Sequence, residues 1–298
     1  MTTEQGTPER VDPAVYTDDY YLTNCHGYED FVTSGGRRVG PRFAKALSLA
    51  GDLRGKRILD VGCGRAEIVI QSAMRGASDA WGIDYAQAAV DIAQRALDTL
   101  EDDAMRVRCH VEQMDVKLLK FEEGYFDVVF MMDVVEHLYP HELAQAFDEL
   151  RRVLRPGGRL VMHTSPNKIF ESVVYPHWSR RVNQAALAAA RLFRFSDGLF
   201  NETMLPTDRV FPHDKWEREM HINEQSAPRL RAAVERHGFR VTRTEFWEPP
   251  SRGGYFESRR LNAELALLDF LRFLRPLSKY PPLNRLFCNH IWMTAERL

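Results

Sequence analysis

The ten residues ILDVGCGRAE, at positions 58–67, constrain the fold of this chain more than any other stretch. The first four read as a buried strand, and the glycines at 62 and 64 then let the backbone turn tightly into a helix. A second apolar stretch, 80–84, ends in Asp84. This order of strand, glycine turn, helix, strand and carboxylate is typical of a site that holds the ribose of an adenosine-containing ligand.

The residue at position 67 narrows the class of ligand. A dinucleotide fingerprint has a third glycine where Glu67 stands, so that a pyrophosphate can approach the helix N-terminus. A carboxylate at that place repels phosphate. We therefore expect a ligand without phosphate. S-adenosylmethionine carries an ammonium, a sulfonium and one carboxylate, and it tolerates acidic neighbours such as Asp60.

Strand and helix patterns alternate along most of the chain. Runs that are apolar on both faces, such as VVFMM at 128–132, are typical of parallel strands covered by helices on both sides. The sequence therefore predicts a doubly wound α/β sheet. The expected elements are helix 37–50, strand 57–61, helix 66–75, strand 80–84, helix 85–100, strand 107–113, strand 126–133, helix 141–154, strand 159–165, helix 226–237, strand 240–247 and strand 290–295.

Two insertions interrupt this alternation. Residues 167–225 contain an alanine-rich basic helix expected at 183–195, and a second insertion at about 248–284 contains a leucine-rich stretch, 261–274. We interpret both as helical caps over the substrate end of the sheet. The remaining units are an N-terminal lid segment at 1–36, a ligand-binding core at 37–166 and the C-terminal part of that core at 226–298.

These motifs resemble those of the class I S-adenosylmethionine-dependent methyltransferases of the small-molecule type. The likeness is close over about 57–166 and rests on Asp60 followed by the small residues Gly62, Gly64 and Ala66. Alanine in the last place is a departure that we expect to cost little, because the helix begins there. The resemblance implies a mostly parallel, seven-stranded Rossmann-like sheet that ends in an antiparallel hairpin. It also implies S-adenosyl-L-methionine as cofactor and S-adenosyl-L-homocysteine as product.

The resemblance assigns further residues to the cofactor. Asp84 would accept hydrogen bonds from both ribose hydroxyls, since a carboxylate offers two acceptors at the separation of a vicinal diol. Asp115 would face the adenine amino group, with Met114 covering the ring, and Asp133 matches the position beside the methionine moiety. Helix capping by Asp84 and turn formation by Asp115 are the structural alternatives. The expected cofactor site is completed by Asp60, Gly62, Gly64 and Tyr85.

Two histidines are the candidate catalytic residues. Methyl transfer requires an acceptor aligned with the S–CH₃ bond, and a hydroxyl acceptor must also lose its proton. His137 follows Asp133 at the carboxyl end of a strand, where open α/β sheets bind ligands, and it is the first candidate for the base. His221 is the second. The alternatives are local hydrogen bonding for His137 and a surface loop for His221, while Glu136 is expected to be solvated or to support a neighbour.

Aromatic residues near the N-terminus are the candidate lid. Tyr20, Tyr21, His26 and Tyr28 would shield the sulfonium and stack on the substrate, with packing for stability alone as the alternative. The histidines and carboxylates near the expected pocket show no metal-ligand spacing such as HxxxH. The sequence therefore predicts no metal.

Composition limits the partners of the chain. The net charge of -2 argues against nucleic acid, which selects for a lysine and arginine excess. The four cysteines are scattered and form no CxxC pair, which predicts free thiols. The N-terminus is polar and the sequence has no long apolar run, which predicts a cytoplasmic protein. The basic and apolar stretches 191–195 and 270–275 would suit a membrane surface or a lipid-linked substrate, but burial of one face against the domain, or a homodimer, is the favoured interpretation.

We thus expect a biosynthetic methyltransferase that acts on a small-molecule acceptor, with O-methylation favoured. N- or C-methylation stays open, because those acceptors need alignment but not this base. Two other functions also fit the sequence. One is a methyltransferase-fold protein that uses the cofactor structurally in a reaction such as cyclisation, and the other is a non-catalytic module that senses the cofactor.

Overall fold

The computed structural model describes residues 10–25, 27–193, 207–211, 215–248 and 277–298. This part of the chain forms a seven-stranded sheet with the order β3-β2-β1-β4-β5-β7-β6. The strands β1 to β5 run parallel, and β7 pairs antiparallel with both β5 and β6. The predicted fold with an antiparallel C-terminal hairpin is confirmed. The strands are β1 (Arg57–Val61), β2 (Asp79–Asp84), β3 (Cys109–Gln113), β4 (Phe126–Met132), β5 (Leu154–Thr164), β6 (Phe239–Phe246) and β7 (Ile291–Arg297).

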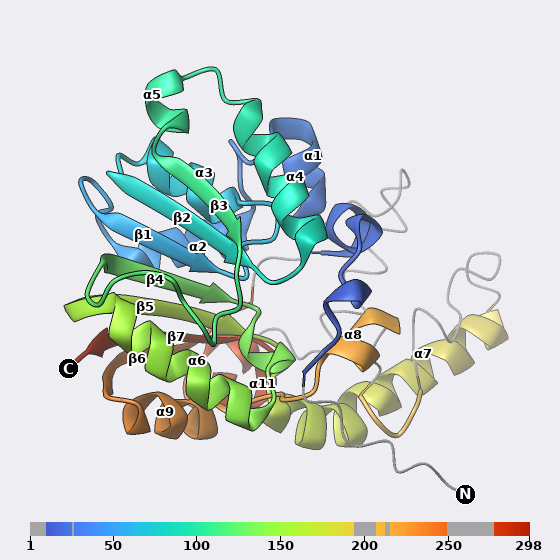
Figure 1. The fold of residues 1–298 in the computed structure, drawn as a ribbon. Helices are drawn as coiled ribbons and strands as arrows, with labels where there is room; N and C mark the ends of the chain where they lie inside the picture. The colour runs from blue at the N-terminus through green and yellow to red at the C-terminus, as the bar shows by residue number, and fades with distance from the viewer. Residues whose placement is uncertain (1–9, 26, 194–206, 212–214, 249–276) are drawn as a thin grey trace, which may run out of the picture.

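Helices cover both faces of the sheet (Figure 1). Side chains alternate along each strand, so that Ile58 joins one apolar cluster and Leu59 the other. Because both faces are covered, the central strands are apolar on both sides, as the sequence predicts. The first cluster includes α2 (Pro41–Ala50), α3 (Glu67–Met74) and α4 (Gln87–Asp98), and the second includes α6 (Pro140–Val153) and α9 (Ala227–Arg236).

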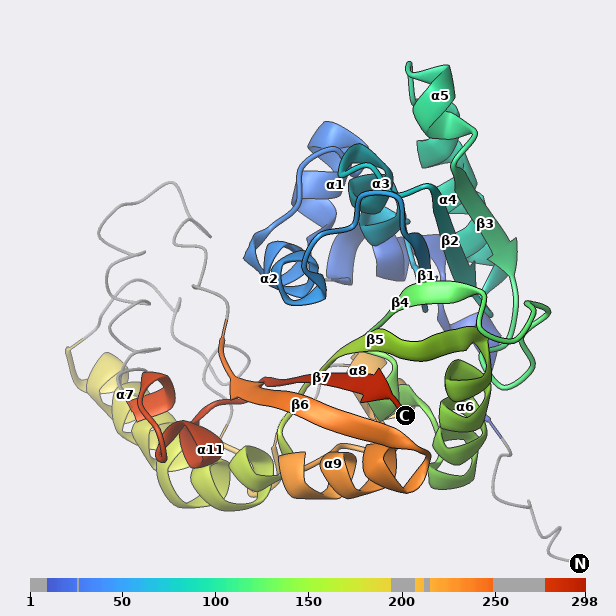
Figure 2. The ribbon, with the colours of Figure 1, turned by 90° about the vertical axis from the view of Figure 1, so that its left-hand side faces the viewer.

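The remaining elements are short or lie outside the two helix layers. Figures 1 and 2 show α7 projecting beyond the sheet, and α8 contacts the N-terminal turn η1 at the end of the strands. The N-terminal elements are η1 (Pro13–Val15), η2 (Tyr20–Asn24) and α1 (Tyr28–Ser34). The others are α5 (Asp103–Arg106), η3 (Val135–His137), η4 (Phe170–Ser179), α7 (Arg180–Phe193), α8 (Lys215–Met220), η6 (Leu277–Lys279) and α11 (Asn284–Phe287).

The predicted boundaries differ from the structure for local reasons. The helix expected from residue 37 begins at Pro41, whose fixed φ suits the first helical turn. The turn at 156–158, expected before the fifth strand, lies inside β5, because the register with β4 shifts between Phe126 and Val128. The leucine-rich stretch 261–274, the basic stretch 270–275 and residues 194–195 lie outside the described residues. Within the described ranges, no helix has the length and apolar character needed to cross a bilayer.

Candidate functional site

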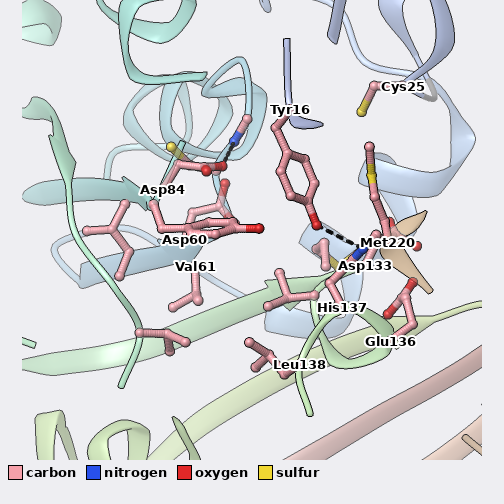
Figure 3. Close-up of a pocket in the computed structure, with 18 of the residues that line it drawn as sticks. Tyr16, Cys25, Asp60, Val61, Asp84, Asp133, Glu136, His137, Leu138 and Met220 are labelled. Atoms are coloured by element: carbon pink, nitrogen blue, oxygen red, sulfur yellow. Dashed lines mark hydrogen bonds between the residues drawn. The ribbon is translucent and has the colours of Figure 1, made fainter. Parts of the chain in front are cut away.

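A cavity of about 290 Å³ lies at the carboxyl ends of β1, β2 and β4, near the lower end of the volumes found for small-molecule pockets. The glycine turn after β1 and the loop after β4 line it, while the N-terminal segment and α8 contribute the other walls. Figure 3 shows Asp60 and Asp84 on one side of this space and Asp133 and His137 on the other. The side chain of Tyr16 points between the two groups.

The glycine turn after β1 leaves no room for a side chain at Gly62. Gly62 has a φ of +67°, and a Cβ placed there would lie 2.5 Å from Cγ2 of Val134. Backbone can therefore approach a ligand at this point. Ala66, at the start of α3, also adopts a left-handed φ of 65°. The expectation that alanine costs little there is wrong, because a left-handed L-residue costs roughly 1–2 kcal/mol.

Asp84 sits at the end of β2 with its carboxylate fixed by the backbone. Its Oδ2 accepts from the N–H of Gly64 at 3.1 Å, and its Oδ1 accepts from the N–H of Ala86 at 3.0 Å. Burial nevertheless raises the pKa of Asp84 to about 6. Each oxygen keeps a second lone pair, so the group fits a ribose diol. Tyr85, the next residue, also lines the cavity.

Asp60 supplies the clearest sign of a missing ligand group. The residue is 3% exposed, lines the cavity, and its Oδ1 has no hydrogen-bond partner among the described residues. Burial raises its pKa well above the usual range, and Glu67 and Asp84 add to the effect. A buried acceptor of this kind calls for a donor from a ligand. The ammonium of S-adenosylmethionine is such a donor.

Met114 and Asp115 line the cavity beyond Asp84. The N–H of Met114 donates to the carbonyl of Asp84 at 2.9 Å, which ties the ends of β2 and β3 together. Asp115 accepts from the N–H of Lys117 at 2.9 Å, so it does form the local turn. The side chain of Lys117 also pairs with the buried Glu142. Adenine contacts by Met114 and Asp115 stay a prediction.

Asp133 adopts a left-handed φ of 54° and joins a chain of buried groups. Arg42 approaches its Oδ2 at 2.9 Å, and His163 donates from Nδ1 to its Oδ1 at 2.8 Å. Although burial opposes ionisation, Arg42 and His163 hold the pKa of Asp133 well below its usual range. The Nε2 of His163 lies 2.9 Å from Nδ1 of His290. Arg42 also lines the cavity, and its Nε has no partner in the described structure, so it suits the cofactor carboxylate.

The two candidate catalytic histidines come together at the other end of the cavity. His137, in η3, and His221, after α8, have ring centroids 4.9 Å apart and both line the cavity. Nδ1 of His137 lies 3.1 Å from the hydroxyl of Tyr16, and Met220 lines the cavity beside the two histidines. Burial, followed by the proximity of His221, lowers the pKa of His137 to about 3. His137 is therefore neutral at physiological pH.

Glu136 is buried, so of its two expected roles the solvated one is wrong and support of neighbouring groups is left. It is 1% exposed and accepts from Oγ1 of Thr164 at 2.8 Å. Its backbone carbonyl accepts from the N–H groups of Ile222 and Asn223 at 2.9 and 3.0 Å. Burial and the charge of Asp133 raise its pKa to about 8. Glu136 therefore ties the loop after β4 to β5 and to the segment that carries the second histidine.

Glu136, His137 and His221 also have ligand atoms within 4.8 Å of one another. Their sequence positions show no metal-ligand spacing, so this proximity arises from the fold alone. The ring of His137 already bonds Tyr16, and Glu136 accepts from the hydroxyl of Thr164. We therefore interpret the group as neighbouring polar side chains with partners of their own rather than as a metal centre.

The predicted lid residues divide into three groups. Tyr20 and Tyr21 line the cavity, and Tyr21 packs over Gly64, where a Cβ would lie 3.5 Å from its ring. Tyr28 begins α1 and is not among the lining residues. His26 lies outside the described residues.

A buried ion pair joins the N-terminal segment to the glycine turn. Arg65 donates to the carbonyls of Tyr21 and Cys25 at 2.5 and 3.1 Å, and its Nη2 lies 2.6 Å from Oε1 of Glu67. The charge of Glu67 is therefore balanced by a neighbour. Its repulsion of phosphate is weaker than the sequence alone indicates.

Sequence reasoning missed several residues of this site. Tyr16 belongs to an aromatic segment that the sequence does single out, but nothing in the pattern separates it from its neighbours. Arg42, His163 and Met220 give no signal at all, because they reach the site through packing of distant segments. Arg65 lies inside the motif itself, yet its role depends on the carbonyls of the N-terminal segment.

A family model described as a methyltransferase domain matches residues 58–158. The chain carries a class I S-adenosylmethionine-dependent methyltransferase domain. The chain is 36% identical over 115 residues to a ubiquinone biosynthesis O-methyltransferase of Alkalilimnicola ehrlichii. The aligned region covers 38% of this chain and 43% of that protein. The chain is 33% identical over 141 residues to the 27-O-demethylrifamycin SV methyltransferase of Amycolatopsis mediterranei, covering 46% and 49%. The chain thus spans less than half the length of each of these relatives.

A solved structure extends the likeness in fold over nearly the whole chain. Geranyl diphosphate C-methyltransferase from Streptomyces coelicolor A3(2), in complex with Mg²⁺, geranyl diphosphate and S-adenosyl-L-homocysteine, superposes with a TM-score of 0.55. The match covers 98% of this chain and 91% of that protein at 14% identity, so it shows the fold alone. S-adenosyl-L-methionine is the cofactor of the methyltransferase domain. The unpartnered oxygen of Asp60 and the fixed carboxylate of Asp84 fit it.

Proposed function

We propose that this methyltransferase transfers the methyl group of S-adenosylmethionine to a hydroxyl of a small-molecule acceptor. The observation that carries the proposal is that a neutral histidine, His137, lines the same cavity as the cofactor-facing carboxylates Asp60 and Asp84. A hydroxyl acceptor must lose its proton as the new bond forms, and a neutral imidazole receives it. The name of the Alkalilimnicola relative, an O-methyltransferase, supports the same acceptor atom.

The bound cofactor supplies a methyl group that its sulfonium has already activated. On this proposal Asp84 holds the ribose, Asp60 accepts from the ammonium and Arg42 pairs with the carboxylate. These contacts fix the methyl group and the acceptor at reacting distance, which is the main requirement of the transfer. Tyr20 and Tyr21 exclude water from the sulfonium side.

The walls of the cavity support a small acceptor. The N-terminal segment and α8 both contribute lining residues, among them Tyr16 and Met220, so the space is bounded on the side away from the sheet. A folded macromolecule would have to displace these walls. We therefore place the acceptor between His137 and the methyl group, within the cavity itself.

The test is a turnover assay with a chemically defined panel of acceptors. The purified protein is incubated with S-adenosylmethionine and with phenols, catechols and sugars, and matched amines test the acceptor atom. We expect mass spectrometry to show a hydroxylated compound that gains one CH₂ while S-adenosylhomocysteine is released. The variant Asp84→Ala serves as the control for cofactor dependence.

Three other results would contradict the proposal. Methylation confined to the amines would move the acceptor from oxygen to nitrogen. A rearranged product of unchanged mass, with the cofactor unspent, would indicate a reaction such as cyclisation. Tight binding of the cofactor without turnover of any acceptor would indicate a cofactor-sensing module.

A further inference from the structure

The N-terminal segment is a fixed wall of the site, because the core holds its backbone. Arg65 donates to two carbonyls of the segment, those of Tyr21 and Cys25. Its charge is balanced by Glu67, and both side chains of this pair are buried. A guanidinium that is buried, paired and bonded to backbone has little freedom. The position of the segment is therefore tied to the glycine turn that faces the cofactor.

Tyr16 lies on this wall and is enclosed by aromatic rings. Its ring centroid is 5.3 Å from that of Tyr85, 5.7 Å from Tyr20 and 6.5 Å from Tyr21. The contacts with Tyr85 and Tyr20 are edge-to-face and the one with Tyr21 is stacked, and together they hold the ring in one orientation. The residue is 7% exposed and lines the cavity, and Figure 3 shows its hydroxyl directed at His137.

The hydroxyl of Tyr16 determines which ring nitrogen of His137 carries the proton. One nitrogen, Nδ1, faces this hydroxyl at 3.1 Å. A protonated phenol is a stronger hydrogen-bond donor than a neutral imidazole N–H, so Tyr16 donates and Nδ1 accepts. Neutral imidazole has a single N–H, and in His137 it is therefore on Nε2.

This arrangement blocks a direct proton transfer from the acceptor to the ring. Nε2 already holds a proton, while Nδ1 is covered by the hydroxyl of Tyr16. The oxygen of Tyr16 has a second lone pair and borders the cavity where an acceptor would lie. We propose that Tyr16 is a catalytic residue that relays the acceptor's proton to Nδ1 of His137. This inference rests on the O-methylation proposed above.

The step balances without any further reactant. The acceptor oxygen forms its bond to the methyl carbon, the S–CH₃ bond breaks, and its electron pair stays on sulfur. The acceptor's proton passes to the oxygen of Tyr16 as the proton of Tyr16 passes to Nδ1 of His137. The imidazolium that results loses its proton to water, which restores the neutral ring. Burial raises the pKa of Tyr16 well above its usual range, so the phenol stays protonated between turnovers.

The tautomer can be tested without an acceptor. We expect ¹⁵N NMR of histidine-labelled protein to show His137 with a protonated Nε2 and an unprotonated Nδ1, assigned by loss of the signals in His137→Gln. In Tyr16→Phe the Nδ1 resonance should shift, because its hydrogen bond is gone. Tyr125→Phe removes a phenol that bonds Asp79 far from the cavity, and it should leave the His137 signals unchanged. A protonated Nδ1, or no shift in Tyr16→Phe, would overturn the assignment.

The relay itself is tested with an acceptor from the panel. We expect Tyr16→Phe to lower kcat by roughly 10-fold to 1,000-fold, within the range of general acid–base effects, while the Kd for S-adenosylhomocysteine changes less than about twofold. The thermal midpoint should stay near that of the wild type, because phenylalanine keeps the ring packing. An unchanged or raised kcat would show that Tyr16 merely obstructs His137. Failure of the whole panel would contradict the proposed function, and the NMR result would still report on the tautomer.

Discussion

The two ends of the cavity are built in different ways. At the cofactor end, Asp60, Gly62, Gly64 and Asp84 all lie within residues 60–84, on two adjacent strands and the turn between them. At the acceptor end, Tyr16 and His137 are 121 residues apart in the chain, and Met220 comes from a third segment. One end is thus a local property of the sequence, and the other exists only when distant segments pack together.

This difference predicts which substitutions change cofactor binding only and which change turnover or stability. A change at the cofactor end should affect binding of the cofactor and little else, because its contacts are backbone hydrogen bonds fixed by a βαβ unit. A change at the acceptor end, or in the Arg65 clamp that holds the N-terminal segment, should alter turnover or stability first.

Loss of His137 should have the largest effect. We expect His137→Ala to lower kcat by about 100-fold to 10,000-fold, since the acceptor's proton loses its final receptor. Calorimetry with S-adenosylhomocysteine should give nearly the wild-type Kd. His237→Ala is the matched control, because that ring bonds Asp148 on the outer face of α6 and should affect neither quantity. A large loss of cofactor affinity in His137→Ala would show that the two ends are not separable.

Loss of Arg65, which binds Glu67 and two carbonyls of the N-terminal segment, should have the second-largest effect, and this effect is on the free energy of unfolding. Arg65→Ala leaves Glu67 buried without its partner, and such a loss typically costs about 3–5 kcal/mol in the free energy of unfolding. Urea denaturation measures it. Arg106→Ala, which removes an exposed pair with Asp103, should cost less than about 1 kcal/mol.

A double variant separates the charge of this clamp from its packing. Arg65→Met with Glu67→Met removes both charges together, so it should be less destabilising than Arg65→Ala despite two substitutions. If the double variant is the less stable protein, Glu67 stabilises the fold through contacts other than its ion pair with Arg65.

The same contrast explains what the sequence could predict. Asp60, Gly62, Gly64 and Asp84 were predictable because their geometry follows from a strand, a turn and a second strand in immediate succession. The strand and helix patterns on either side of the turn indicate a left-handed glycine there. The end of the next strand likewise indicates where its carboxylate lies. Their roles in binding the cofactor stay predictions, but their placement around one cavity follows the pattern.

The acceptor end shows where such reasoning stops. The burial of Glu136 depends on Thr164 from β5 and on backbone from 222–223, neither of which its own neighbourhood encodes. Likewise, Tyr16 differs from Tyr28 only by where the N-terminal segment crosses the cavity. Long-range packing places these side chains at the cavity. The residue types next to each one in the sequence therefore do not indicate that position.

Substitution of the ribose carboxylate tests the cofactor end directly. We expect Asp84→Ala to weaken binding of S-adenosylhomocysteine by roughly 1–3 kcal/mol, the scale of hydrogen bonds to a charged group. Asp84→Asn keeps the shape of the side chain but replaces one acceptor with a donor, and it should lose a comparable amount. Calorimetry gives both values. Wild-type affinity in either variant would remove Asp84 from the ribose site.

The pKa of Asp84 predicts a pH dependence with a definite sign. Its folded value of about 6 lies above the ordinary 3.8, so the stability gained from its protonated form is present below 3.8 and is lost as the pH rises through about 6. Ribose binding needs the ionised form, so cofactor affinity should change in the opposite direction. From pH 7 to pH 5 we expect the Kd for S-adenosylhomocysteine to rise about tenfold. The Asp84→Asn protein should lack this rise, and persistence of it would assign the effect to Asp60 or Glu136.

The smallest expected effect comes from the left-handed alanine at the start of α3. Ala66→Gly removes strain of roughly 1–2 kcal/mol, but glycine gives back about 0.5–1 kcal/mol through its greater freedom in the unfolded chain. We therefore expect the free energy of unfolding to rise by at most about 1.5 kcal/mol, measured by urea denaturation. Gly64→Ala, at a φ of +51°, should shift stability in the opposite direction. If Ala66→Gly instead weakens cofactor binding with no gain in stability, the methyl group of Ala66 positions the turn, and the cofactor end is less local than its sequence implies.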